Sequence, residues 1–233
     1  MSTALITGAS QGFGRALAIE LAQQGWTVVA TGRDARRLHT TRADGRGLIV
    51  PVRGDVRGRA HQVELIDTAR DLGGLDLVVH NASELGESPL QEVATLDLDV
   101  LREIFEVNVV APVALTQLAL PLLRNSALPT VVALSSDAAV EAYPGWSGYG
   151  ASKAALDHAM AVLAAERENS PLAVYSFDPG DMRTAMHQAA FPGEDISDRP
   201  QPETVVPALL GLLRTRPASG RYRAADLLTA VPS

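Results

Sequence analysis

A tyrosine and a lysine are spaced so that both can act on one reacting group. Tyr149 and Lys153 are four residues apart in an alanine-rich stretch, and on a helix residues at this spacing share one face. A free tyrosine, with a pKa of about 10, is a poor acid or base at pH 7, and a nearby ammonium lowers that pKa because it stabilises the phenolate. Such a pair could give a proton to a reacting oxygen or take one from it.

A serine precedes this pair at the end of an expected strand. Ser136 follows the apolar run Thr130–Ser135. Open parallel sheets bind their ligands beyond the carboxyl ends of the strands. A serine there, Ser135 or Ser136, can hydrogen-bond a substrate carbonyl.

A glycine-rich turn lies near the N-terminus. Gly8, Gly12 and Gly14 form a GxxxGxG pattern between a short apolar run and a helical stretch. Glycines there let the backbone approach a pyrophosphate, and the following helix offers free N–H groups and a positive dipole end. A glycine-rich loop without a ligand is the alternative, but the placement between strand and helix favours a dinucleotide site.

A cluster of arginines follows the second expected strand, Thr27–Thr31. NAD sites usually have an acidic residue at this strand tip for the ribose 2′-hydroxyl, and none stands there. Arg33 follows instead, with Arg36 and Arg37 close by, and guanidinium groups bind phosphate well. This favours NADP(H), with Arg33 the best candidate. The alternative is an ordinary exposed helix start with Asp34 as its N-cap.

Strand-like and helix-like stretches alternate along the chain. The expected strands are Ala4–Thr7, Thr27–Thr31, Gly47–Val52, Leu75–His80, Thr130–Ser135, Leu172–Phe177 and an edge strand Arg221–Ala225. The expected helices are Gly14–Gln24, His61–Leu72, Leu98–Leu123, Ser147–Arg167 and Glu203–Arg214. Near-continuous apolar strands are typical of strands buried on both faces. We therefore predict an α/β fold: a doubly wound, Rossmann-type parallel sheet with helices on both faces, in a single domain of residues 1–233. Two prolines, Pro112 and Pro121, are expected to kink or break the longest helix.

Composition excludes several classes of function. The 233 residues include no cysteine, which excludes disulfides, thiolate catalysis and cysteine-ligated metals. The five histidines show no ligand spacing, so we expect no metal site. A net charge of −7 argues against a nucleic-acid partner. We found no apolar run long enough to span a membrane and no signal peptide, and therefore expect a cytoplasmic protein without a membrane partner.

Taken together, these motifs resemble those of the short-chain dehydrogenases/reductases with the TGxxxGxG turn, over nearly the whole chain. The resemblance implies hydride transfer between NADP(H) and a carbonyl or alcohol carbon of a small molecule. It implies catalytic roles for Asn108, Ser136, Tyr149 and Lys153. It implies cofactor contacts from Gly8, Ser10, Gln11, Gly12, Phe13, Gly14, Arg33, Asp55, Val56, Asn81, Ala82, Tyr149, Lys153, Pro179, Gly180 and Thr184. The sequence departs from the NNAG element of this family, since His80 and Ser83 replace its outer Asn and its Gly.

The substrate is the least specified part of the sequence. Residues 184–203 are expected to be a substrate loop, because residues 191–203 are polar and rich in proline. Candidate wall residues are Tyr143, Trp146, Met186, His187 and Phe191, which indicate a partly apolar substrate. The apolar helices that contain Pro112 and follow Tyr149 predict a homodimer or homotetramer.

Three other functions share single features with this sequence. Gly145–Tyr149 comes near the GxSxG elbow of hydrolases, but the last glycine is missing and no strand leads directly into it. A sugar-nucleotide epimerase would usually carry a GxxGxxG turn. The main alternative is a non-catalytic NADPH-binding regulatory or sensor protein, which would have no use for the four catalytic candidates together.

Overall fold

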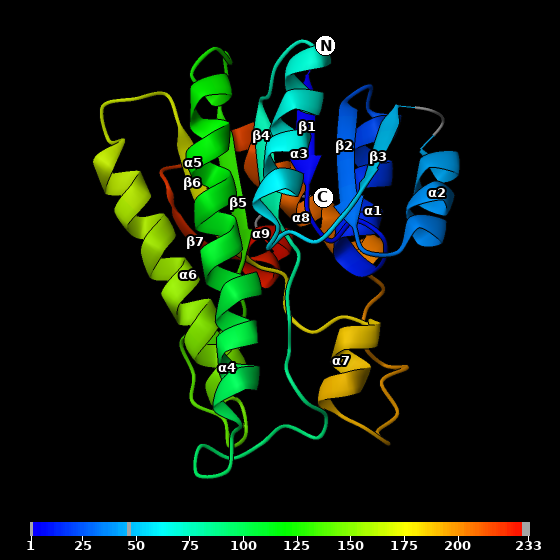
Figure 1. Cartoon of the computed structure of the whole chain (residues 1–233), viewed down its shortest axis with the longest axis vertical. Coiled ribbons are helices and arrows are strands. Elements are labelled where there is room, and N and C mark those ends of the chain that lie inside the picture. Colours follow the sequence, from blue (N-terminus) through cyan, green and yellow to red (C-terminus); the bar gives the residue numbers. More distant parts are fainter. Residues whose placement is uncertain (1, 46–47, 230–233) are drawn as a thin grey trace.

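The computed structural model describes residues 2–45 and 48–229, which form a seven-stranded sheet. The strands are β1 (Thr3–Ile6), β2 (Thr27–Gly32), β3 (Ile49–Arg53), β4 (Leu77–His80), β5 (Thr130–Leu134), β6 (Ala173–Asp178) and β7 (Gly220–Arg223). Their order is β3-β2-β1-β4-β5-β6-β7, and every neighbouring pair is parallel. The predicted doubly wound α/β fold is confirmed (Figure 1).

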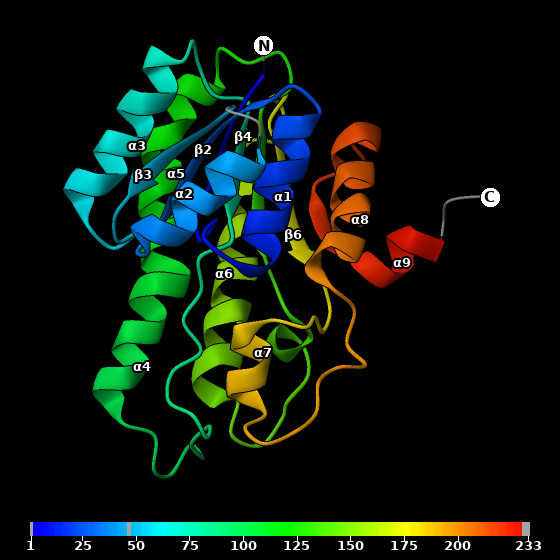
Figure 2. The ribbon, with the colours of Figure 1, turned by 90° about the vertical axis from the view of Figure 1, so that its right-hand side faces the viewer.

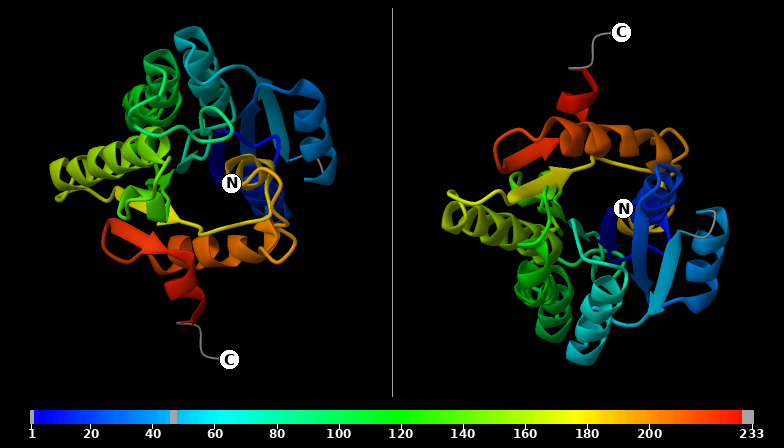
Figure 3. Two further views of the ribbon diagram at one scale, coloured as in Figure 1. Left: turned by 90° about the horizontal axis from the view of Figure 1, so that it is seen from below. Right: turned by 90° about the horizontal axis from the view of Figure 1, so that it is seen from above.

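Helices cover both faces of the sheet (Figure 3). The α-helices are α1 (Gly12–Gln23), α2 (Ala35–Asp44), α3 (Arg59–Asp71), α4 (Leu98–Phe105), α5 (Ala111–Leu123), α6 (Ser147–Glu166), α7 (Ala185–Ala190), α8 (Pro202–Thr215) and α9 (Ala224–Thr229). A π-helical segment, η1 (Glu106–Val110), joins α4 to α5, and a 3₁₀ turn, η2 (Asp137–Ala139), follows β5. Helices α3, α5 and α6 lie on one face, and α1 and α8 on the other.

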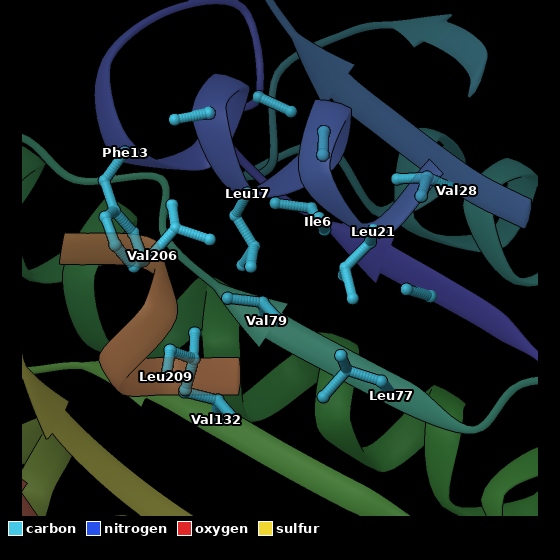
Figure 4. Packing of buried hydrophobic residues seen from close by; sticks show 14 of the residues in the cluster. Ile6, Phe13, Leu17, Leu21, Val28, Leu77, Val79, Val132, Val206 and Leu209 are labelled. Atoms are coloured by element: carbon cyan, nitrogen blue, oxygen red, sulfur yellow. The ribbon is translucent and has the colours of Figure 1, made fainter. Parts of the chain in front are cut away.

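The middle strands are buried along their whole length, as their unbroken apolar sequences predict. Every residue of β1, β4, β5 and β6 is buried. On one face, α1 and α8 pack their apolar sides onto these strands (Figure 4). The labelled core residues are Ile6, Phe13, Leu17, Leu21, Val28, Leu77, Val79, Val132, Val206 and Leu209. This packing fixes the strand ends, and therefore the loops that follow them.

The long helical region differs from its expectation. Helical structure runs through Leu98–Leu123, and Pro121 lies inside α5 without ending it. The irregularity is the π-helical segment η1, which ends at Val110, two residues before Pro112. Proline has no N–H, and its ring clashes with the carbonyl four residues earlier, which here belongs to Asn108. Such single-turn π segments are frequent at functional sites.

The same run also corrects the membrane expectation. Within the described residues, Leu98–Leu123 is one stretch of 26 residues that is long and apolar enough, by length and composition, to cross a membrane. The sequence does not show it as an uninterrupted apolar run, because polar residues such as Asn108 and Thr116 lie within it. In the fold, Leu115, Ala119 and Leu123 are buried in the core beside the sheet, whereas Leu98 and Val110 are exposed, and 44% of the most apolar 18 residues of the run is buried.

Several local expectations also change. The strand expected from Gly47 begins at Ile49, and residue 47 lies outside the described residues. Helix α2 follows β2, and Asp34 caps it by accepting a hydrogen bond from the backbone N–H of Arg37. Residues 184–203 are not all loop, because they include α7. The edge strand ends at Arg223, where α9 begins.

The carboxyl ends of the strands face the lower side of the molecule in Figure 1. Helix α7 and the long segment between β4 and α4 lie below the sheet there, and Figure 2 shows both from the side. In an open parallel sheet this is the edge at which ligands bind. The fold thus brings the ends of β1, β4, β5 and β6 to one place.

Candidate active site

The glycine-rich turn is locked against the end of β4. Gly8 has a positive φ of 66°, and a Cβ added to it would lie 2.8 Å from both the Ala82 Cα and the Asn81 Nδ2. The Asn81 amide in turn donates hydrogen bonds to the carbonyls of Thr7 (2.9 Å) and Gly8 (3.1 Å). A side chain at Gly8 would force β4 away from the turn. Glycine is therefore required here by packing as well as by backbone conformation.

A hollow of about 440 Å³ opens beside this turn, and we call it the glycine-rich hollow. Of the predicted cofactor residues, it is lined by Gly8, Ser10, Gln11, Gly12, Phe13, Arg33, Asp55, Val56, Asn81, Ala82 and Thr184. Gly14 lies behind the lining, where a Cβ would clash with Asn81. The volume lies within the range of small-molecule and cofactor sites. Bare glycine backbone at the start of α1 gives a dinucleotide pyrophosphate room and N–H donors, so the residues present fit that group.

Three arginines, Arg15, Arg33 and Arg183, line the glycine-rich hollow from different elements. Arg33 follows β2 with its side chain 72% exposed, and its Nη2 lies 3.9 Å from the Glu84 Oε2. Arg15 in α1 also lines the hollow, and the sequence analysis missed it although it directly follows the last glycine of the turn. Arg36 and Arg37 do not line it, and Arg37 instead donates a hydrogen bond to Gln11.

Asp55 lines the glycine-rich hollow in an ionised form. The Arg57 guanidinium donates hydrogen bonds to its carboxylate, the shortest 2.8 Å, and these hold the pKa of Asp55 below its usual value. Asp55 therefore presents acceptor oxygens only. An acceptor here suits the amino or hydroxyl group of a nucleoside.

Tyr149 and Lys153 lie one turn apart at the start of α6, as predicted. The Lys153 Nζ is 5.4 Å from the centre of the Tyr149 ring and donates a 2.7 Å hydrogen bond to the Leu134 carbonyl at the end of β5. Lys153 is buried, and burial lowers its pKa to about 8. The ammonium is thus held at a fixed point beside the phenol.

The pKa of Tyr149 differs from the expectation. The pKa of Tyr149 is raised to about 12, chiefly by burial; hydrogen bonds with Ser83 and Ser136 oppose the rise, and the carboxylates of Asp178 and Asp137 add to it. The sequence predicts that Lys153 lowers this pKa. The opposite direction arises because the protein withdraws the phenol from water more than it stabilises the phenolate. Tyr149 is therefore held protonated at neutral pH.

The structure separates the two serines after β5. Ser136 hydrogen-bonds with the Tyr149 hydroxyl and also donates to the Asp137 Oδ1 at 2.9 Å. Ser135 donates instead to the Asp157 Oδ2 at 2.6 Å. The preference for Ser136 near the reacting oxygen agrees with this geometry.

Asn108 holds the segment after β4 from the π-helical segment η1. Its side-chain amide donates to the Glu84 carbonyl (2.8 Å) and to the Ser152 Oγ (2.9 Å), and its Oδ1 accepts from the Glu84 N–H (2.7 Å). Ser83 donates to the same Oδ1 at 3.2 Å. Because Ser83 also hydrogen-bonds with Tyr149, it links Asn108 to the phenol. The sequence marked Ser83 only as a departure from a motif and did not predict this contact.

A second hollow, of about 120 Å³, opens in front of Tyr149, and we call it the tyrosine hollow. Ser136, Trp146, Met186 and His187 line it, together with Pro179, Gly180 and Thr184. Tyr143 and Phe191 do not line it, although their rings pack against Trp146 at 6.4 and 5.8 Å between centres. Met182, Thr184 and Met186 line both hollows, so the two are neighbours.

Comparisons with known proteins agree with this arrangement. The model of the short chain dehydrogenase family matches residues 2–195. An uncharacterized oxidoreductase of Escherichia coli, YciK, is 34% identical over 222 residues, which are 90% of this chain and 84% of that protein. A benzil reductase of Bacillus subtilis is 32% identical over 190 residues, which are 80% of this chain and 76% of that protein.

Solved structures of short chain dehydrogenases are also similar to this chain. A short chain dehydrogenase from Shigella flexneri, complexed with NADP, has a TM-score of 0.89 at 30% identity and covers 96% of this chain and 97% of its own. One from Escherichia coli, complexed with NADPH, has a TM-score of 0.86 at 31% identity and covers 96% of each chain. With the fold, the family match and these relatives in agreement, the chain belongs to the short-chain dehydrogenase family of oxidoreductases.

Proposed function

We propose that this protein transfers a hydride between NADP(H) and a carbonyl or alcohol carbon of a small molecule. The observation that carries the proposal is the position of Tyr149. Its hydroxyl hydrogen-bonds with Ser136, Lys153 is fixed beside its ring, and the tyrosine hollow adjoins the glycine-rich hollow. Tyr149, the proposed proton donor, therefore lies in the hollow that adjoins the proposed cofactor site.

NADP(H) is the proposed cofactor, and it supplies or accepts the hydride when bound. Gly8, Gly12 and the start of α1 would hold its pyrophosphate, and Arg33 and Arg15 would bind a 2′-phosphate. Two of the solved relatives were complexed with NADP or NADPH, which supports this choice. The other predicted contacts remain part of the proposal.

The proposed chemistry uses the chain's own residues in sequence. Ser136 orients the carbonyl oxygen, and Tyr149 gives its proton to that oxygen as the carbon is reduced. A phenol held protonated suits this direction of reaction. Lys153 stabilises the phenolate that remains, and Asn108 holds the Ser83–Glu84 segment against Tyr149. The Bacillus subtilis relative is a benzil reductase, and benzil is a diketone, which supports a carbonyl as the reducible group.

The test is the oxidation of NADPH, with NADH in parallel, against aldehydes, ketones, α-diketones and quinones. Tyr149→Phe is the control, since it removes the proton and leaves the glycine-rich hollow unchanged. We expect turnover with NADPH, a loss of about 1,000-fold in the variant, and nearly unchanged NADPH affinity. Full turnover by the variant would exclude Tyr149 as the acid. NADPH binding without turnover of any substrate class would favour the non-catalytic sensor.

The homodimer or homotetramer, the cytoplasmic location and the single domain stay predictions. Outward-facing Val110 after α4 and Val162 in α6 are exposed, as a subunit interface on these helices requires. Light scattering coupled to gel filtration at micromolar concentration would measure the mass of the assembly, and a mass of one chain would contradict the oligomer.

A further inference from the structure

An aspartate continues the row of catalytic candidates along α6. Tyr149, Lys153 and Asp157 follow one another at intervals of four residues, so they share one face of the helix. The end of β5 fixes two of them. The Leu134 carbonyl accepts a 2.7 Å hydrogen bond from the Lys153 Nζ. The next residue, Ser135, donates a 2.6 Å hydrogen bond to the Asp157 Oδ2. The carboxylate is therefore held one helical turn beyond the ammonium.

Asp157 acts on the charge of Lys153. Burial lowers the pKa of Lys153 to about 8, and the Asp157 carboxylate opposes this lowering. A buried ammonium keeps its proton more readily when a negative charge lies nearby. Without Asp157, a larger share of Lys153 would be neutral between pH 7 and pH 8. A neutral amine cannot stabilise the phenolate that proton transfer leaves on Tyr149.

An arginine on the edge strand β7 connects this aspartate to the active site. The Arg221 Nε donates to the Asp157 Oδ2 at 3.3 Å, and its Nη2 donates to the Asp178 Oδ2 at 2.8 Å. The same Nη2 donates to the Ser136 carbonyl at 2.9 Å. One guanidinium thus joins α6 to the ends of β5 and β6.

The two aspartates that Arg221 binds act on different members of the catalytic pair. Asp178, with its side chain 4% exposed, adds to the rise in the pKa of Tyr149. Asp157, with its side chain 15% exposed, raises the pKa of Lys153 against the effect of burial. Because the guanidinium lies between the two carboxylates, it offsets part of the field of each. Arg221 therefore limits both effects.

The other charged groups around the pair differ in position from this network. Asp157 and Arg221 line a third hollow, of about 340 Å³, and are not among the described residues of the tyrosine hollow. They can therefore act on the pair without contacting the substrate. The other groups at the tyrosine hollow are Asp137 on η2, and Asp181 after β6 with its partners His187 and Arg199. The remaining charged residues of α4, η1 and β7, which also pack against α6, are exposed: Asp99, Arg102, Glu103, Glu106 and Arg223.

We propose that Asp157 and Arg221 are positioning residues of this active site. Asp157 supports the positive charge of Lys153. Arg221 balances the carboxylates of Asp157 and Asp178 and holds the Ser136 carbonyl in place. Together they extend the tyrosine–lysine pair into a charge network that reaches the edge strand. The inference rests on the proposed function, since it assigns these residues to the same reaction.

The protonation of Lys153 can be measured without turnover. Lys153 is the only lysine in the 233 residues, so a single NMR signal from isotope-labelled lysine reports its titration. We expect Asp157→Asn to move the midpoint to lower pH by about half a pH unit or more, because the ammonium loses a carboxylate. Arg221→Gln should move it to higher pH, because Asp157 is then no longer offset.

The matched control is Glu166→Gln, which removes a carboxylate from the far end of the same helix. It should leave the midpoint unchanged. Asp157→Asn keeps the size of the side chain and an oxygen for Ser135, so it carries the test if Arg221→Gln does not fold. An unmoved midpoint in Asp157→Asn, or shifts of both variants in one direction, would overturn the proposal.

The rate of NADPH-dependent reduction should follow the same order. The fall in kcat at high pH should begin at lower pH in Asp157→Asn and at higher pH in Arg221→Gln than in the wild type. Arg221→Gln should also lower kcat by about threefold to tenfold, because the Ser136 carbonyl loses its charged donor. Arg221→Lys should restore the pH profile and only part of kcat, since lysine keeps the charge but lacks the fork that reaches three acceptors.

The two measurements separate this inference from the reductase function. A lower kcat with an unmoved pH profile in every variant would show a merely structural role and overturn the proposal. Lysine midpoints that shift as expected, without turnover of any substrate class, would overturn the reductase function and keep the charge network.

Discussion

The two neighbouring hollows differ in the groups that line them. The glycine-rich hollow is shaped by bare backbone at Gly8 and Gly12, with Arg15 and Arg33 among its lining residues. The tyrosine hollow is shaped by side chains, with aromatic rings, three aspartates and no lining arginine or lysine among the described residues. The arginines of the glycine-rich hollow suit an anionic ligand. The tyrosine hollow, which has no lining arginine or lysine among the described residues, suits a neutral ligand. The comparison teaches that arginines, which could bind a phosphate, line only one of the two hollows, although carboxylates line both.

The largest expected effect lies where the hollows meet. Lys153→Met should lower kcat for NADPH-dependent reduction by about 100-fold or more, because the phenolate left on Tyr149 loses its ammonium. The pKa of Lys153 is lowered by burial to about 8, so the ammonium is present below that pH and lost above it. The wild-type rate should therefore fall as pH rises through about 8. A wild-type profile that stays flat to pH 9.5 would contradict this role.

The second prediction concerns the glycine-rich hollow alone. Arg33→Ser should raise the dissociation constant of NADPH by about 10- to 100-fold, the value of charge-assisted hydrogen bonds to a phosphate. The affinity for NADH should not change. Fluorescence titration with each cofactor measures both, and Arg36→Ser, outside the lining, is the matched control. Equal losses for NADPH and NADH would refute a role specific to the 2′-phosphate.

The third prediction concerns the pH dependence of the stability of the fold, and it rests on His80 at the end of β4. His80 is buried there, its Nε2 lies 2.8 Å from the Thr116 Oγ1, and burial lowers its pKa to about 3. Above its unfolded-state pKa of about 6.5 the residue is neutral in both states, and below it only the unfolded state gains a proton. Stability is therefore lost as pH falls, by roughly 2 kcal/mol between pH 7 and pH 5.

Urea unfolding at the two pH values measures this loss. His80→Asn, which places the usual residue of the NNAG element there, should remove most of the difference between pH 7 and pH 5. An unchanged acid loss in that variant would assign the pH dependence to other groups.

The smallest expected effect concerns Ser83. Its hydroxyl hydrogen-bonds with Tyr149 and lowers the pKa of that phenol, against the stronger effect of burial. Ser83→Gly should raise the pKa of Tyr149 and slow alcohol oxidation by about threefold to tenfold, the worth of one neutral hydrogen bond. The pH profile of alcohol oxidation should move to higher pH, whereas Ser83→Thr, which keeps the hydroxyl, should not move it. Identical profiles for all three proteins would leave Ser83 a packing residue.

Local constraints let the sequence predict much of this protein. The order of strands and helices follows from apolar runs and turn glycines, and the glycine-rich turn follows from backbone freedom that only glycine has. The spacing of Tyr149 and Lys153 follows from the pitch of one helix. Each of these signals lies within a single short segment, so it can be read from neighbouring residues.

The tertiary structure decided what depends on distant segments. The rise in the pKa of Tyr149, which lies on α6, comes from burial and from Asp178 at the end of β6. Ser136 faces the phenol and Ser135 faces Asp157 because β5 ends beside α6. Ser83 reaches Tyr149, and the rings around His187 gather beside it, only after the strand ends meet at one edge. Solvent exclusion and side-chain proximity are properties of packing, and no local pattern in the sequence encodes them.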